Sequence, residues 1–167
     1  MTARAARAAL LAAALSATGG ARVLAQGTPT TTLTISSGST ATFANPTLSD
    51  YVNGYIDGPT VTFTVTTAQG GAQARTTTVE VCASSATLGS GKAISKLLWQ
   101  PTDNSKPYQS ILTGCTGTVN PARVVATNAI SRGGSWSGGV RLRMILDWTD
   151  TAPSYGTTIE MALSVSP

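Results

Sequence analysis

The chain of 167 residues contains no histidine, only two cysteines and only seven acidic residues. Without histidine, it lacks the most common general base and the most common metal ligand in proteins. A Ser-His-Asp or Cys-His nucleophile system is therefore excluded in its usual form, and so is a zinc site with cysteine and histidine ligands. We expect no catalytic residue, no metal and no cofactor.

The few acidic residues also give little support for a hydrolase or a calcium site. A glycosidase needs two carboxyl groups that face one cleft, and Asp147 and Asp150 are the closest acidic pair in the sequence. We expect Asp147 instead to form a cross-strand ion pair with the neighbouring arginines. The spacing of Asp50 and Asp57 matches no known calcium-binding loop.

The segment Gly89-Ser90-Gly91-Lys92 is only superficially similar to a phosphate-binding loop. The full motif needs glycine five positions before Gly91 and serine or threonine after the lysine, where this chain has Ala86 and Ala93. We therefore interpret this segment as a turn.

The N-terminus has the three-part layout of a secretory signal peptide. Arg4 and Arg7 form a basic start, which residues 8–17 follow as an apolar run. Val23-Leu24-Ala25 then places small residues at the positions that an export peptidase recognises. The apolar run is too short for a comfortable membrane span. We expect residues 1–25 to be removed, and the protein to be secreted, periplasmic or on the cell surface without a membrane span.

The mature chain would begin at Gln26 and contain 142 residues, which is the usual size of one domain. We expect residues 26–31 to form a flexible lead-in and residues 32–167 to form the folded domain. Signal removal takes away three arginines and no acidic residue, so the net charge falls from +4 to +1. That charge lacks the electrostatic footprint of a nucleic-acid-binding protein, and we expect no nucleic-acid partner.

Cys82 and Cys115 are the only cysteines. In an oxidising compartment the default for such a pair is one disulfide. Closing a loop of that size would stabilise the fold by about 3–4 kcal/mol on the chain-entropy model. The alternative is two free buried thiols.

The nine residues from Val140 to Trp148 form a long segment with the alternating pattern of a strand. Every second residue from Val140 is large and apolar, and these residues alternate with Arg141, Arg143 and Asp147. A period of two is typical of a strand with one face on a core. We expect a central strand of an antiparallel sheet, with Trp148 in the core.

Other segments with short apolar runs or alternation predict the neighbouring strands. They lie at residues 32–35, 40–43, 60–67, 76–83, 94–99, 108–112, 119–130 and 159–165. The segments 60–67 and 76–83 flank the turn residues Gln69-Gly70-Gly71, and we expect them to pair as a hairpin. Residues 48–56 predict a loop or broken strand, and residues 131–139 predict a Gly/Ser loop.

Seven to nine short strands separated by turn residues predict a single all-β domain, namely a two-layer antiparallel β-sandwich. A closed β-barrel is the alternative. The order Cys82, Trp99, Cys115 resembles that of an immunoglobulin domain, but the cysteines are much closer together and Thr113 stands where that family has a tyrosine. The resemblance implies a sandwich and nothing finer. In size, export signal and single disulfide, the chain is similar to bacterial pilins and other surface β-subunits.

Aromatic residues are the main functional signal. Trp136 lies in the predicted Gly/Ser loop, where it would either pack back onto the end of the sheet or form an exposed platform for a sugar or a partner protein. Tyr51, Tyr55 and Tyr155 are candidates for the same binding surface.

We expect a secreted, non-enzymatic β-sandwich with a structural, adhesive or surface-assembly role, which self-associates or contacts other surface proteins. A carbohydrate-binding module that uses exposed aromatics to hold a glycan is the alternative.

Overall fold

The structure is a computed structural model, and it describes residues 23–26, 31–68, 74–89, 91–116, 118–131, 133–150 and 155–166. Several predicted segments therefore lie wholly or largely outside the described residues: residues 1–22 of the signal peptide, residues 27–30 of the lead-in at 26–31, and the Gln69–Gly71 turn. No helix in the described segments is long and apolar enough to cross a membrane.

Almost all regular structure in the described residues is β-strand. The strands are β1 (Val23–Gln26), β2 (Thr31–Ser37), β3 (Thr40–Thr42), β4 (Tyr55–Thr67), β5 (Arg75–Ala83), β6 (Leu97–Pro101), β7 (Gln109–Ser110), β8 (Val124–Ile130), β9 (Ser135–Ile145) and β10 (Gly156–Ser166). A short helix, α1 (Leu48–Asn53), and a 3₁₀ turn, Ile94–Lys96, complete the fold.

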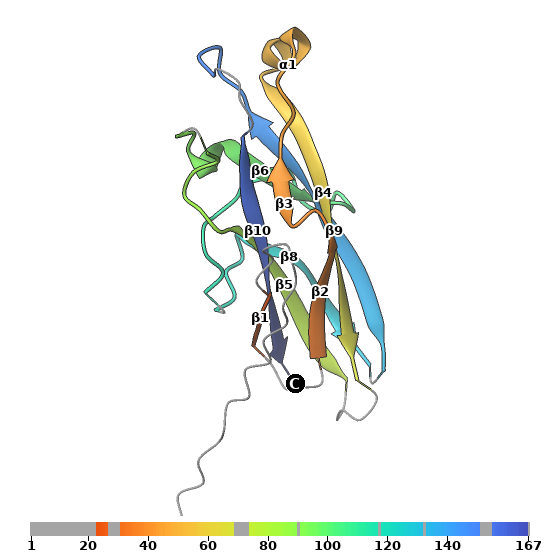
Figure 1. Cartoon of the computed structure of the whole chain (residues 1–167). Coiled ribbons are helices and arrows are strands. Elements are labelled where there is room, and N and C mark those ends of the chain that lie inside the picture. Colours follow the sequence, from red (N-terminus) through yellow and green to blue (C-terminus); the bar gives the residue numbers. More distant parts are fainter. Residues whose placement is uncertain are drawn as a thin grey trace, which may run out of the picture.

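These strands form two sheets that pack face to face as a β-sandwich (Figure 1). One sheet has the order β1-β10-β5-β8, with β3 also paired to β10, and the other has the order β2-β4-β9-β6-β7. Every ladder between these strands is antiparallel except that of β1 with β10, which is parallel. The predicted sandwich is confirmed, and the closed barrel is not formed.

The predicted central strand is confirmed as β9, which lies between β4 and β6 in the middle of its sheet. Val140, Leu142 and Met144 are buried on its core face, as their period of two predicts. Trp148 was expected to continue that face, and this prediction is wrong, because its side chain is 71% exposed. The strand ends at Ile145 and the chain turns at 148–149, so the alternation no longer sets the direction of side chains there.

The predicted hairpin between residues 60–67 and 76–83 is also wrong. Both segments are strands, but β4 pairs with β2 and β9, whereas β5 pairs with β10 and β8 in the other sheet. Their connection, residues 68–74, is longer than the two-residue turns that best enforce a hairpin. The alternation correctly predicted which residues face the core, but a core-facing residue packs equally well in either layer of a sandwich.

Residues 48–53 form helix α1 where a loop or broken strand was expected. Thr47 and Asp50 make a capping box, in which the Asp50 backbone N–H donates to Thr47 Oγ1 and the Thr47 backbone N–H donates to Asp50 Oδ2. These bonds from Thr47 lower the pKa of Asp50. Gly54 ends the helix at a left-handed φ of 75°, and β4 begins directly after it.

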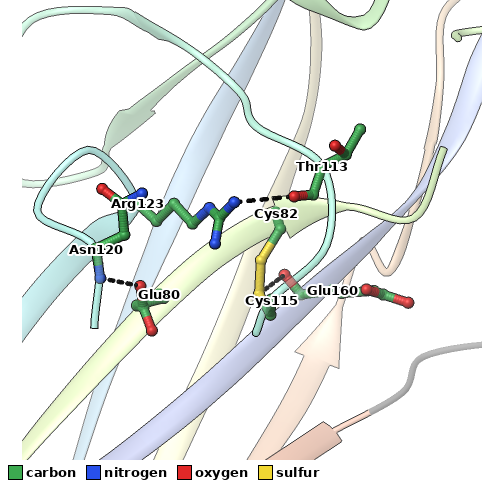
Figure 2. Close-up of a disulfide and its surroundings, with 7 residues drawn as sticks. All are labelled: Glu80, Cys82, Thr113, Cys115, Asn120, Arg123 and Glu160. Atoms are coloured by element: carbon green, nitrogen blue, oxygen red, sulfur yellow. Dashed lines mark hydrogen bonds between the residues drawn. A yellow bond between two sulfur atoms is a disulfide. The ribbon is translucent and has the colours of Figure 1, made fainter. Parts of the chain in front are cut away.

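The predicted disulfide between Cys82 and Cys115 is confirmed, with 5.7 Å between the Cα atoms (Figure 2). Cys82 points away from the main core, as the alternation along β5 predicts, and packs with Ala162 on the outer face of the sheet. The segment after the disulfide is held on the same face. Its Asn120 backbone N–H donates to the buried Glu80 carboxylate at 2.7 Å (Figure 2).

Candidate functional site

The four aromatic residues predicted to form a binding surface do not form one. Trp136 is opposite Val65 in the β4–β9 ladder, whereas Tyr55 is opposite Ile145 at the other end of the same ladder. Ten residues of strand separate Val65 from Tyr55, which corresponds to roughly 30 Å. Tyr51 contacts Trp148 and Tyr155 contacts Lys92, whereas Tyr55 contacts Arg143.

Trp136 packs back onto the sandwich, which is the first of the two arrangements considered for it. It belongs to β9 and not to a loop, so the predicted loop at 131–139 is wrong over its second half. Its indole N–H donates to Thr77 Oγ1 on β5 at 2.9 Å, and its ring meets Phe63 edge to face at 5.3 Å. Trp136 therefore links the two sheets. It also borders a hollow of 130 Å³ that Val125 and Asn128 line from β8.

A different group of apolar side chains is exposed at one end of the molecule. Leu48 and Val52 on α1 are 73% and 71% exposed, and Trp148 in the loop after β9 is 71% exposed. We call these three residues the apolar tip. Leu48 and Val52 are four residues apart and so share one side of the helix. Figure 1 shows α1 and the loop after β9 at the end of the sandwich opposite the C-terminus.

Specific contacts hold the apolar tip in place. The Tyr51 ring stacks on the Trp148 ring with 5.4 Å between centroids and 18° between planes. The Tyr51 hydroxyl donates to the Asp150 carbonyl oxygen at 2.6 Å, which joins α1 to the loop after β9. Within that loop, the Asp147 backbone N–H donates to Asp150 Oδ2 at 2.7 Å. The exposed residues thus sit on a bonded framework that limits the entropy lost when a partner contacts them.

An ion pair between Lys92 and Asp150 anchors this framework. Only 6% of the Lys92 side chain and 13% of the Asp150 side chain are exposed. Burial raises the pKa of Asp150, but hydrogen bonds from Lys92 and from the Asp147 backbone outweigh burial and leave that pKa lowered. The Lys92 ammonium also lies 5.6 Å from the centre of the Tyr155 ring. Burial first, and then the charge of Asp150, raise the pKa of Tyr155.

Tyr55 belongs to a separate cluster on the outer face of the β4–β9 sheet. The Arg143 guanidinium lies 3.7 Å from the centre of the Tyr55 ring and 4.4 Å from that of Tyr108. Arg143 also donates to both oxygens of Asp57 at 2.7 and 3.1 Å, which raises the pKa of Arg143. A cross-strand ion pair was expected here with Asp147, and Asp57 is the partner instead. Asp147 pairs with Lys96.

The acidic residues of these clusters are engaged in structural contacts. Asp50 caps α1, Asp57 binds Arg143, and Asp150 binds Lys92. Among the residues that the structure describes, no group of three or more cysteine, aspartate and glutamate side chains could hold a metal ion. The clusters supply aromatic and apolar contact surface rather than a pair of free carboxylates.

The fold and the site together define a disulfide-linked antiparallel β-sandwich with an exposed aromatic and aliphatic tip. Comparisons with models of known protein families, with curated proteins and with solved structures gave no match to this chain. The physical character of the apolar tip is therefore the best guide to function.

Proposed function

We propose that the protein is a secreted, non-enzymatic β-sandwich that acts by contact, in a structural, adhesive or surface-assembly role outside the cytoplasm. The observation that carries the proposal is the apolar tip. Two aliphatic side chains and one indole ring are each more than two thirds exposed at the same end of the molecule. Grouped exposed apolar residues mark contact sites, and Trp and Tyr are enriched among residues that dominate binding energy.

The sequence and the covalent structure support this role. The predicted signal peptide directs the chain to export. The Cys82–Cys115 disulfide suits an oxidising compartment, where such bonds persist. The chain has no histidine, and the acidic residues near the apolar tip are paired or cap a helix.

The test uses the exported protein and substitutions at the apolar tip. Trp148→Ala and Val52→Asp should each weaken binding to cell envelopes of the source organism by at least about tenfold, as expected for residues at the centre of a contact. Val119 is also an exposed aliphatic residue, at 45%, and lies outside the apolar tip. Val119→Asp is therefore the matched control and should bind as the wild type does.

Pull-down with envelopes measures this binding, and sedimentation measures self-association. If Trp148→Ala and Val52→Asp behave like the wild type in both assays, the apolar tip has no role in contact. If the wild-type protein neither self-associates nor binds envelopes, the proposed function is wrong as a whole.

Carbohydrate binding is the second candidate function, and the Tyr51–Trp148 stack favours it. Tyr51 stacks on the indole ring, and Trp148 is still 71% exposed. A flat, exposed ring of this kind can contact the apolar face of a sugar. On a glycan array, Trp148→Ala should abolish binding, whereas Trp136→Ala should not, because Trp136 packs between the sheets.

A further inference from the structure

Strand β10 has β5 on one side and two short strands, β3 and β1, on the other side, which we call the β10 edge. On one side β10 pairs with β5 along its length from Ile159 to Ser166. On the other side β3 pairs with residues Gly156–Thr158, and β1 pairs with residues Met161–Ser164. C-terminal to the β3 ladder, β10 pairs on this side with the four residues of β1.

The backbone groups that point to this edge belong to odd-numbered residues. The Ile159 N–H donates to the Ser39 carbonyl oxygen at 2.8 Å, on the side away from β5. Backbone groups alternate between the two edges of a strand, so those of Met161, Leu163 and Val165 point the same way. The side chains of Met161 and Leu163 are buried in the core, which fixes the register of this edge.

The β10 edge lacks the features with which exposed edges are usually protected. Residues 159–166 include no proline and no lysine, and Glu160 is their single charge. The ladder with β5 runs through eight residue pairs without a register shift. By contrast, a shift interrupts the β2–β4, β4–β9 and β5–β8 ladders. An edge that is long, regular and nearly uncharged is a ready template for another strand.

The predicted signal cleavage site, after Ala25, lies within β1. β1 consists of Val23–Gln26, and cleavage after Ala25 removes all of it except Gln26. Export processing would therefore leave the backbone groups of Met161 and Leu163 without their strand partner. Val165 lies just beyond the β1 ladder, which ends at Ser164. β3 would stay in place, because it lies within the mature chain.

We propose that, in the processed protein, the β10 edge pairs with the β10 edge of a second copy of this chain, antiparallel about a two-fold axis. This inference rests on the proposed assembly role and adds a surface for self-association that is separate from the apolar tip. If the axis passes through Leu163, Met161 pairs with Val165 of the second copy, and each pair exchanges backbone hydrogen bonds. Glu160 then faces the uncharged Ser166, so no like charges meet. The contact is closed and symmetric, which is the commonest form of homodimer.

The first experiment compares two exported forms by sedimentation over a concentration series. One is the natural processed protein, with its N-terminus checked by intact mass. The other is released from a heterologous signal peptide before Gly20, so that it keeps β1. The processed form should dimerise, and the form with β1 should remain monomeric. Hydrogen exchange at the Leu163 amide should slow as the processed form dimerises.

A substitution at the edge provides the second experiment. Val165→Pro removes an amide that points away from β5, so the ladder with β5 keeps its hydrogen bonds while the free edge loses a donor. It should raise the dimer Kd about tenfold, whereas the matched control Val165→Ala, which keeps the amide, should leave it nearly unchanged.

Three results would overturn the inference. The first is a natural N-terminus upstream of Val23, since β1 would then stay in the exported protein. The second is a dimer that survives both retention of β1 and Val165→Pro. In that case the copies assemble through another surface, such as the apolar tip, and the proposed function stands. The third is a processed form that stays monomeric at every concentration; if it also fails to bind envelopes, the proposed function fails with the inference.

Discussion

At the scale of single residues, Asp150 connects an ion pair with Lys92 to the apolar tip through Tyr51. Its carboxylate joins Lys92 and the loop after β9, and its pKa is lowered by those bonds. A carboxyl with a lowered pKa in the folded state stabilises the fold above its unfolded pKa of about 3.9, and the contribution disappears as the pH falls through the folded value.

The Asp150→Asn variant should therefore be less stable than the wild type near neutral pH, and the difference should shrink as the pH falls below about 4. Urea unfolding at a series of pH values measures this difference. Asp103→Asn serves as the comparison, because Asp103 is exposed and its pKa is lowered by its hydrogen bonds with Ser105 rather than by a buried ion pair, so its pH-dependent loss should be smaller. A gap between wild type and Asp150→Asn that stays constant down to pH 2 would contradict the role given to this ion pair.

Neighbouring residues on β9 should differ sharply in their contributions to stability. Leu142 is buried on the core face, and Leu142→Ala should cost about 2–5 kcal/mol of unfolding free energy. Arg141 is on the opposite, exposed face, where it donates to Asn104 Oδ1 and the Thr102 carbonyl oxygen. Arg141→Ala should cost less than about 1 kcal/mol. Chemical denaturation of both variants checks the assignment of faces, and equal losses would contradict it.

At the scale of the elements, the disulfide belongs to a layer outside the main core. Cys82 and Cys115 are 33 positions apart in the sequence and pack with Ala162, apart from the residues between the sheets. Replacing both cysteines by alanine should lower the unfolding free energy by about 3–4 kcal/mol, through the wider unfolded ensemble.

The inter-sheet core should survive that double substitution, because its residues are not in the disulfide cluster. Circular dichroism should therefore keep the same β signal at low temperature, while the melting temperature falls. A loss of β structure at low temperature would show that the disulfide is needed to form the sandwich and not only to stabilise it.

The sequence predicted strands and their faces well, but it did not predict their partners. The alternation in β4, β5, β9 and β10 is local, and burial on one face follows directly from it. Partner choice depends on contacts between distant segments, which is why the expected β4–β5 hairpin lies in two different sheets. Helix α1 had a local signal, since Thr47 and Asp50 have capping-box spacing. The nearby Asn53-Gly54 and Asp57-Gly58 dipeptides are typical of turns and favour a loop instead.

Most residues of the candidate site could not be predicted from such local patterns. Tyr51 was among the predicted binding residues, but Trp148 was expected in the core, because the period of two was extended past the end of β9. Leu48 and Val52 carry no signal of exposure on their own. The partner of Lys92 could not be predicted either, because Asp150 follows it by 58 residues and only the fold brings them together.

At the scale of the whole molecule, the position of the apolar tip has a consequence for valency. The apolar tip and the C-terminal end of β10 lie at opposite ends of the sandwich (Figure 1). Two copies joined antiparallel along β10 would therefore present their tips in opposite directions. Such a dimer could bind two separate surfaces at once, whereas a monomer could bind only one. Divalent attachment raises apparent affinity through effective concentration, so agglutination of ligand-coated beads should follow dimerisation and vanish in the form that retains β1.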